Sequence, residues 1–427
     1  MIVVILVAAL AIGVPVAFSI VAALLYFMAV GEMPYMLRLV PTQMFSGLDS
    51  FPLLAIPLFV LAGEVMNASG ITTRIIAFAM VLVGWCRAGL ALVNIWASVI
   101  FAGLSGSAVA DTSAIGRVFI PQMNARGYPL DFAAALTAAS SVIGPIIPPS
   151  IPVIIYALIA SGVSVPALFL AGVVPGVLLA VFLSVYVMIF AGRYEADAAP
   201  EVAEEPRKSR LWTVLDGILP VLMPIFVVGT ILLGVVTPTE AAAFAVAYAL
   251  ILGMIVYREL PVTSLPAIFS RSMVDSSIIL IIIAAVAAGN WLMTYNRIPN
   301  LITDFTLAFV DSQWTFLLAV IVLLLIVGLF LEGIAAMLVL VPILHPIAVS
   351  LGIDPVHFGI VVIFNLMIGL ITPPMGLCLF VADSIANVGI GKLSRAVLPF
   401  FLVQVVVLLI LAFVPDTVTL LPRLFGF

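Results

Sequence analysis

A chain of 427 residues would by length alone suggest two or three soluble domains, but its composition excludes them. Apolar residues make up 65% of the chain and charged residues 8%, and the mean hydropathy is +1.40, whereas soluble domains average roughly 45–50% apolar and about 25% charged residues. The composition indicates an all-α polytopic membrane protein and excludes cytosolic enzymes, nucleic-acid-binding proteins and secreted disulfide scaffolds. The net charge of −5 adds little, because most of the chain does not meet bulk water.

Apolar segments long enough to cross the ~30 Å hydrocarbon core as helices follow one another along the chain. The predicted spans are 2–29, 52–68, 129–160, 166–192, 218–236, 239–257, 272–295, 356–384 and 395–414. The segments 34–49, 71–86, 262–271 and 298–309 mix apolar and polar residues, which favours short helices in the membrane interface. Residues 415–427 form a C-terminal tail.

Two apolar regions, 88–124 and 313–350, differ from these spans because each has small or polar residues at its middle. These residues are Ser105-Gly106-Ser107 in the first region and Glu332-Gly333 in the second. Two half-length helices that meet at a tip, a re-entrant hairpin, fit this pattern. Two complete spans would need more residues, so we expect hairpins.

One hydrophilic stretch, from Arg193 to Arg210, is predicted to link two halves of the chain. Its basic residues place it in the cytoplasm. Counting spans outward from this stretch leaves only Arg38, Arg297 and Arg423 on the opposite side. The expected topology therefore has a cytoplasmic N-terminus and a periplasmic C-terminus.

The two halves share a pattern of glycines and prolines. Gly144-Pro-Ile-Ile-Pro-Pro recurs as Gly369-Leu-Ile-Thr-Pro-Pro, an offset of 369 − 144 = 225, and Ala62-Gly63-Glu64 resembles Ala288-Gly289-Asn290. Such self-similarity indicates an internal repeat. The span count starts the first unit inside and the second outside, so the repeats are inverted. Inverted repeats with hairpins and broken helices are typical of secondary transporters.

The repeats divide the chain as follows. The first unit, 1–192, contains scaffold helices (1–87), a hairpin (88–124), a broken helix (129–160) and a further helix (166–192). A cytoplasmic linker and its helix occupy 193–238. The second unit, 239–414, contains a hairpin (313–350), a broken helix (356–384) and a helix (395–414).

The Gly-Pro motifs predict where the chemistry lies. Each proline removes a backbone donor and clashes with the preceding turn, so the helix breaks, and in lipid the freed carbonyl groups need a partner. A Na⁺ ion can serve, because unwound carbonyls and half-helix ends direct oxygen lone pairs into the gap. A packing kink is the alternative, but two repeat-related copies that each follow a hairpin favour ion binding.

Polar residues near the tips and breaks are the candidate ligands. Asp111 is the strongest candidate, because a carboxylate within the membrane is costly and usually functional. It could instead pair with Arg117. Ser107 and Thr112 could simply bond to the helix backbone. The sodium-binding candidates are Ser105, Ser107, Ser140, Gly144, Ile147, Glu332, Gly333, Asn365, Gly369 and Thr372, with Ser141 as a further side-chain candidate. The substrate-binding candidates are Ser107, Asp111, Thr112, Pro149, Ser150 and Pro374.

Over essentially its whole length the chain resembles the large membrane subunit of TRAP (tripartite ATP-independent periplasmic) transporters. The resemblance rests on Gly13-Val-Pro-Val-Ala-Phe18, Pro57-Leu-Phe-Val-Leu-Ala-Gly-Glu64, Ser105-Gly-Ser-Ala-Val-Ala-Asp111, the stretch from Phe132 to Ser150, and Thr372-Pro-Pro-Met-Gly376.

The resemblance implies a Na⁺-driven importer of carboxylate-bearing solutes in the bacterial inner membrane, and not an enzyme. It implies two partners, a periplasmic substrate-binding protein and a small four-helix membrane subunit, with no cofactor besides Na⁺ as the coupling ion. It also implies an elevator mechanism, in which 88–192 and 313–414 move against the other helices.

A stand-alone carrier and a channel are two alternative classes of protein. A stand-alone Na⁺/dicarboxylate carrier would share the hairpins and broken helices but need no binding protein. A channel would need a continuous polar path, whereas the polar residues here gather at two breaks. Glu64 and Asn94 lack repeat support strong enough for a role, and hydrogen bonds within the scaffold are expected for them.

Overall fold

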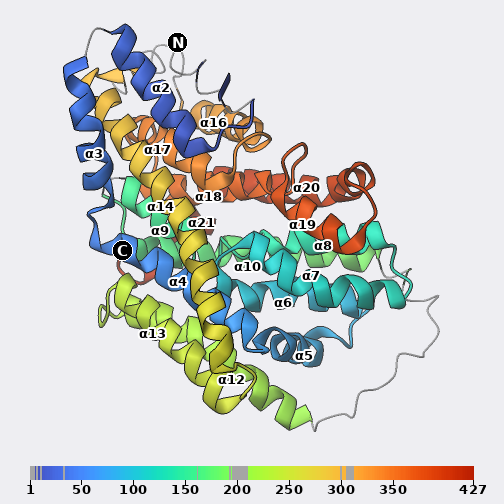
Figure 1. Cartoon of the computed structure of the whole chain (residues 1–427). Coiled ribbons are helices and arrows are strands. Elements are labelled where there is room, and N and C mark those ends of the chain that lie inside the picture. The colour runs from blue at the N-terminus through green and yellow to red at the C-terminus, as the bar shows by residue number, and fades with distance from the viewer. Residues whose placement is uncertain are drawn as a thin grey trace.

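The computed structural model describes residues 12–31, 34–160, 162–191, 210–298 and 312–427, with the isolated positions 5, 8, 9, 194 and 301–303 (Figure 1). These residues form helices and no strand. The first half contains α2 (Val16–Val30), η1 (Pro34–Arg38), α3 (Leu39–Leu48), η2 (Phe51–Leu54), α4 (Ala55–Ala68), α5 (Ile71–Val83), α6 (Gly89–Ser105), α7 (Ala108–Ala125), α8 (Leu130–Ser141), α9 (Ile151–Ile159) and α10 (Val165–Phe190).

The second half follows α12 (Arg210–Leu232). It contains α13 (Pro238–Leu250), η3 (Ile251–Val256), η4 (Val262–Ser264), α14 (Leu265–Tyr295), α16 (Gln313–Gly328), α17 (Gly333–Ser350), α18 (Pro355–Gly369), α19 (Leu377–Ala386), α20 (Ile390–Phe413) and α21 (Asp416–Leu424). The series of helices from α6 to α10 in the first half therefore corresponds to the series from α16 to α20 in the second half.

Seven helical segments among the described residues are long and apolar enough to cross a membrane. They are Phe51–Ala68, Val165–Phe190, Thr213–Leu232, Pro238–Val256, Val262–Tyr295, Gly333–Ser350 and Ile390–Phe413. Large apolar side chains cover their outer surfaces, as at Ile225 (63% exposed) and Ile255 (65% exposed). A surface this apolar fits lipid rather than water, and the chain is a multi-pass membrane protein.

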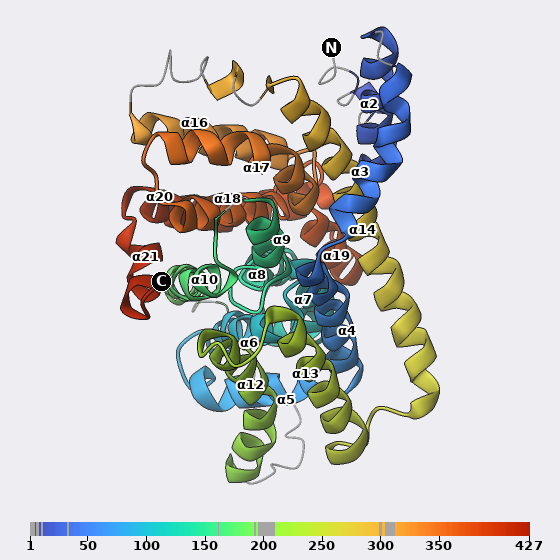
Figure 2. The same ribbon diagram turned by 90° about the vertical axis from the view of Figure 1, so that its left-hand side faces the viewer.

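The helices fall into two groups. Helices α2 and α3 lie at one edge and α5, α12 and α13 at the opposite edge, with α4 and α14 running between these edges (Figures 1 and 2). We call α2–α5 and α12–α14 the scaffold group. Helices α6–α10 and α16–α20 fill the middle of the molecule and form the central group.

The two halves interlock within the central group. Helix α7 packs on α8, and α17 packs on α18 in the corresponding place. Across the halves, α19 packs on α7 and α8, whereas α9 packs on α17 and α18. Each half therefore holds the second part of the other half's broken helix.

The hairpin regions form two helices each, joined at the predicted tips. Their helices are 16 to 18 residues long, which is about 24–27 Å at 1.5 Å per residue. Each predicted hairpin region therefore contains two helices that meet at its tip, as the sequence predicted, and a re-entrant path within the membrane stays a prediction.

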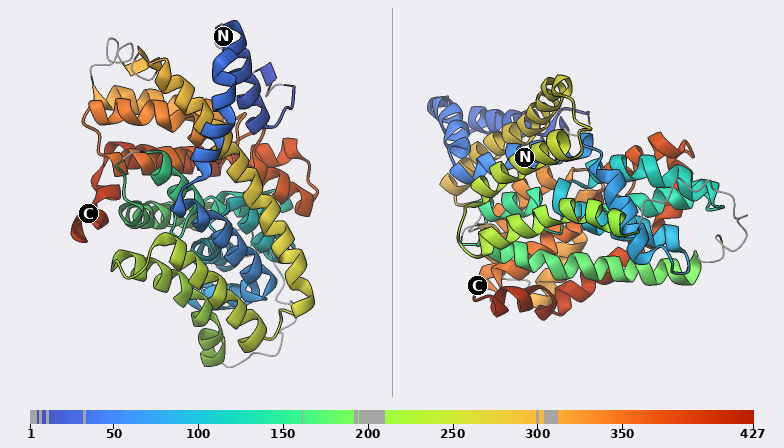
Figure 3. Two further views of the ribbon diagram at one scale, coloured as in Figure 1. Left: turned by 60° about the vertical axis from the view of Figure 1, so that its left-hand side comes forward. Right: turned by 90° about the horizontal axis from the view of Figure 1, so that it is seen from below.

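Two segments that were predicted separately form the single helix α14. The segments 262–271 and 272–295 were predicted as an interfacial helix and a span, but Leu265–Tyr295 is a single helix of 31 residues. It has a proline only in its first turn, where a proline's missing N–H is harmless. In the left-hand view of Figure 3, α14 crosses the outside of the molecule. The predicted interfacial segment 34–49 contains α3, which packs along α14.

Other boundaries differ near the ends of predicted spans. The predicted helix 2–29 is interrupted, because the described residues 12–15, which include Gly13 with φ +86 and Pro15, are not helical and α2 begins at Val16. Helix α12 begins at Arg210 rather than at 218 and ends at Leu232. Most of the linker 193–209 and of the segment 298–309 lies outside the described residues. The predicted tail contains a short helix, α21.

Candidate functional site

The first broken helix opens between α8 and α9. Helix α8 ends at Ser141 and α9 begins at Ile151, and the nine residues between them are almost entirely buried. Pro148 has no N–H to offer the carbonyl of Gly144, four residues earlier, so the ladder of helical hydrogen bonds stops there. Ser150 starts α9 by accepting a hydrogen bond from the backbone of Val153 (3.4 Å).

The second broken helix repeats this construction between α18 and α19. Helix α18 ends at Gly369 and α19 begins at Leu377. Thr372 lies in the gap, where its hydroxyl donates to the carbonyl of Ile368 at 2.8 Å. The Pro148–Pro149 and Pro373–Pro374 peptide bonds are both cis, at matching positions of the two motifs.

Each hairpin tip touches the break of its own half. At the first tip, Gly106 has φ +59, and a Cβ atom built there would lie 3.0 Å from the carbonyl oxygen of Pro149. At the second, a Cβ atom on Gly369 would lie 3.0 Å from the Cα of Gly328, at the end of α16. Only glycine allows backbones to approach this closely.

Both tips also begin a helix with a side-chain cap. Ser107 accepts a hydrogen bond from the backbone of Ala110 (3.4 Å), and Glu332 accepts one from the backbone of Ala335 (3.1 Å). These residues are repeat partners, because 332 − 107 = 225. Helices α7 and α17 therefore begin at the two tips, and the unsatisfied N–H groups at a helix N-terminus favour anionic groups.

Asp111 lies completely buried beside the first break. Its Oδ1 accepts a hydrogen bond from the Ser105 hydroxyl, whereas its Oδ2 has no hydrogen-bond partner. A methyl group at Gly144 would collide with Oδ2, so this oxygen points at the break. Arg117, the alternative partner, is exposed and lines a cavity that does not include Asp111.

Ser140 and Asn365 are repeat partners that bind the first helix of their hairpins. The Ser140 hydroxyl accepts a hydrogen bond from the Ser98 hydroxyl (3.0 Å) and donates one to Oδ1 of Asn94 (3.2 Å), both in α6. The Asn365 amide donates to the carbonyl of Ile321 in α16 at 3.0 Å, and its Oδ1 has no partner. Asn94 also donates to the hydroxyl of Thr137 (2.7 Å), so it belongs to a buried hydrogen-bond network.

The remaining sequence candidates lie around these groups but play local roles in the structure. Thr112 and Ser141 donate to backbone carbonyls within their own helices, as the alternative interpretation of such hydroxyls anticipates. Gly333 packs on α18 and Ile147 packs on α10 at Gly176. Pro149 is buried, whereas Pro374 is exposed.

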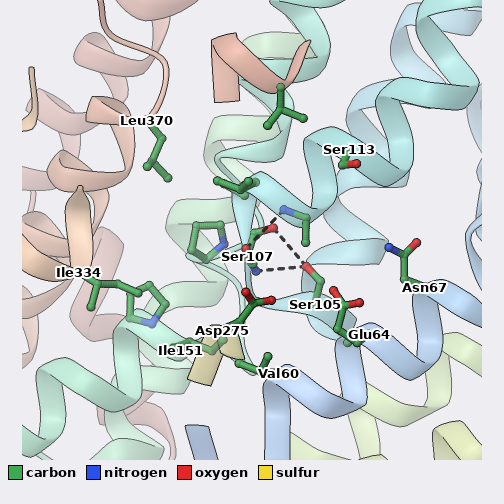
Figure 4. A pocket seen from close by; sticks show the side chains of 18 of the residues that line it. Val60, Glu64, Asn67, Ser105, Ser107, Ser113, Ile151, Asp275, Ile334 and Leu370 are labelled. Atoms are coloured by element: carbon green, nitrogen blue, oxygen red, sulfur yellow. Dashed lines mark hydrogen bonds between the residues drawn. The ribbon is translucent and has the colours of Figure 1, made fainter. Parts of the chain in front are cut away.

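A cavity of about 530 Å³ lies between the scaffold group and both hairpin tips (Figure 4). Ser105 and Ser107 line it from the first tip and Glu332 from the second. Pro145 and Leu370 come from the two breaks. The scaffold wall carries further polar side chains, which are Glu64, Asn67 and Asp275. The volume falls in the ~300–1,000 Å³ range of small-molecule sites.

A second cavity of about 650 Å³ adjoins the first and shares Glu64, Asn67 and Asp275 with it. It is lined by two arginines, Arg117 of α7 and Arg271 of α14, both exposed. In the predicted topology this is the cytoplasmic side.

The sequence predicted the tips and breaks, but it did not predict most of the other polar residues that line the cavity. Asn67, Ser113, Asp275 and Ser384 also line the central cavity, and Glu64 had no assigned role. Single polar residues in otherwise apolar helices were the available signal.

The fold defined by two broken helices, each touched by a hairpin tip, is that of a membrane transporter. The crystal structure of the YdaH transporter from Alcanivorax borkumensis has a TM-score of 0.63 over 89% of both chains, at 15% identity, and shares this fold.

The chain belongs to the tripartite ATP-independent periplasmic (TRAP) transporter family, as its DctM component, whose family model matches residues 3–417. It is 39% identical to the sialic acid TRAP transporter large permease protein of Vibrio cholerae over 97% of this chain and 96% of that protein. It is 35% identical to the C4-dicarboxylate TRAP transporter large permease protein of Rhodobacter capsulatus over 99% of this chain and 98% of that protein. The resemblance noted from the motifs is thereby confirmed.

Proposed function

We propose that this chain is the large permease of a Na⁺-coupled importer of carboxylate-bearing solutes. The observation that carries the proposal is the contact of each hairpin tip with a broken helix, at the edge of one cavity that has polar side chains in its wall. A carrier needs its ion and solute sites at such a junction, so that binding of one affects the other.

The ion sites would lie at the breaks. Asp111 offers an unpartnered oxygen beside Gly144, whose carbonyl has lost its helical donor. Asn365 offers an unpartnered amide oxygen close to the second break, which starts four residues later at Gly369. Carboxylate, amide and carbonyl oxygens are suitable ligands for a hard cation such as Na⁺.

The solute would bind in the central cavity, between the N-termini of α7 and α17. Backbone N–H groups at a helix N-terminus attract a carboxylate. The two relatives described above are named for sialic acid and C4-dicarboxylates, and both substrates carry carboxylates. We therefore propose a carboxylate-bearing solute for this chain.

The movement would be of the elevator type. The cavity lies between the scaffold group and the central group, so sliding of the central group would carry the tips and breaks past α4 and α14. In this proposal the repeats are inverted, the N-terminus is cytoplasmic and the C-terminus is periplasmic. The partners would be a periplasmic binding protein and a small membrane subunit, as the tripartite family description suggests.

Proteoliposomes test the proposal. They would contain the chain with its small membrane subunit, with labelled N-acetylneuraminate or succinate supplied by the cognate binding protein. We expect uptake only with an inward Na⁺ gradient and only with the binding protein. Na⁺-driven uptake of succinate without the binding protein would instead support a stand-alone dicarboxylate carrier.

A further inference from the structure

Two cavity-lining residues of the scaffold group correspond to each other in the sequence repeat. Glu64 on α4 and Asn290 on α14 are partners in the pair Ala62-Gly63-Glu64 and Ala288-Gly289-Asn290, an offset of 290 − 64 = 226. Glu64 lines the two large cavities described above. Asn290 lines a separate cavity of about 260 Å³, between α14 and the helices α9 and α17.

The small cavity is built from the repeat partners of the large one. At the same offset, Val286 corresponds to Val60 (286 − 60 = 226). In the central group, Leu338 corresponds to Ser113 (338 − 113 = 225), and Ile159 corresponds to Ser384 (384 − 159 = 225). The first member of each pair lines the small cavity and the second lines the central one. The two are therefore the same scaffold–hairpin junction, formed once by each repeat.

The two junctions differ in size. The Glu64 side is about 530 Å³ in the central cavity and about 650 Å³ in the adjoining one, against about 260 Å³ on the Asn290 side. Leu338 and Ile159 line the small cavity at the positions that correspond to Ser113 and Ser384 of the central cavity. The Asn290 Oδ1 is buried there without a hydrogen-bond partner. A buried amide oxygen left unpaired is unfavourable, and contact with water or solute would remove that penalty.

We propose that the Asn290 cavity is the closed counterpart of the Glu64 cavity, and that Asn290 contacts the solute when the carrier opens to the other side. The inference rests on the proposed elevator movement. In carriers built from inverted repeats, movement of one part against the other around the site opens it to each side in turn. Opening of the α14–α17 junction would then expose Asn290, as the α4–α7 junction exposes Glu64 here.

The amide group of Asn290 suits contact with an anionic solute. An amide offers both donors and an acceptor, so Asn290 can hydrogen-bond a carboxylate or a hydroxyl on the periplasmic side.

Cysteine labelling tests the proposal in the complete transporter. The background carries Cys86→Ser and Cys378→Ala, and Asn290→Cys and Glu64→Cys are introduced singly. A membrane-impermeant methanethiosulfonate reagent is added to right-side-out or inside-out vesicles that contain both membrane subunits. Gln404→Cys is the buried control, because Gln404 is fully buried within the central group.

We expect the Asn290→Cys variant to react several-fold faster than the control from the periplasmic side, and the Glu64→Cys variant to do so only from the cytoplasmic side. An Asn290→Gln variant should keep more uptake than Asn290→Leu at equal amounts in the membrane. Labelling of the Asn290→Cys variant no faster than the control, in vesicles that still import the solute with Na⁺, would overturn the inference and leave the proposed function standing. Loss of Na⁺ dependence in the parent chain would instead remove the proposed function.

Discussion

Two buried oxygen atoms, the Oδ2 of Asp111 and the Oδ1 of Asn365, carry the chemical argument at the scale of single residues. Both are buried without a hydrogen-bond partner, and each residue belongs to a helix that ends or begins at a break or tip. In a membrane interior an unpartnered polar group is retained at a cost, so a function is the expected reason for it. Ion binding is that function in our proposal.

Replacement of Asn365 by alanine should weaken the Na⁺ dependence of uptake. The change removes a proposed ion ligand, so we expect a higher Na⁺ concentration for half-maximal uptake, measured in proteoliposomes. Gln404→Ala is the matched control, because Gln404 is equally buried, donates to the carbonyl of Ala139 at 2.9 Å and has an unpartnered Oε1. Equal shifts in both variants would point to a packing effect and count against an ion site at Asn365.

Asp111→Asn should have a stronger effect of the same kind. The substitution keeps the shape of the side chain and removes the negative charge that would balance the cation. We expect at least a tenfold higher Na⁺ requirement, which corresponds to ~1.4 kcal/mol. Asp416→Asn, an exposed carboxylate paired with Arg423 at 3.2 Å, should behave as the parent chain does. An unchanged Na⁺ requirement in the Asp111 variant would exclude this carboxylate as a ligand.

The sequence predicted the site residues unevenly, for a physical reason. Ser105, Ser107 and Glu332 line the cavity as expected, because each lies at a turn that local sequence marks. Asp275 and Asn67 line the same cavity but come from scaffold helices whose position depends on packing between distant parts of the chain. No local pattern carries that information.

At the scale of elements, the tips and breaks are positioned by glycines that bring backbones together. The contact between Gly328 and Gly369 joins the end of α16 to the end of α18. Breaks at proline pairs follow from the missing N–H groups and were predictable from the sequence. The length of α14 was not, because the polar residues near its start, such as Ser270 and Arg271, resemble those of an interfacial helix. In the structure they line cavities.

Gly369→Ala should separate the second tip from its break. The added Cβ would meet Gly328 backbone atoms at 3.0 Å, and such overpacking typically costs 1–3 kcal/mol. We expect a lower melting temperature of the purified complex and a loss of uptake. Gly391→Ala is the control, since nothing lies within 4 Å of its Cβ position. A Gly369 variant with parental stability and uptake would show that this close contact is dispensable.

At the scale of the whole molecule, the fold joins two similar halves that exchange parts. Helix α9 of the first half packs on the second, and α19 of the second packs on the first. The sequence repeat predicts two related halves, and it could not show this exchange, because the contacts join residues more than a hundred positions apart. Because of this exchange, residues of both breaks line one cavity. A structural change at either break would therefore alter the proposed solute site.

The dependence of uptake on Na⁺ is the most direct test of the central claim. Solute uptake is measured in proteoliposomes with both membrane subunits and the binding protein, first with Na⁺ outside and then with choline replacing it at equal ionic strength. We predict that uptake stops in choline and returns when Na⁺ is restored. Uptake that continues at the same rate in choline would contradict the assignment of the two helix breaks as Na⁺ sites.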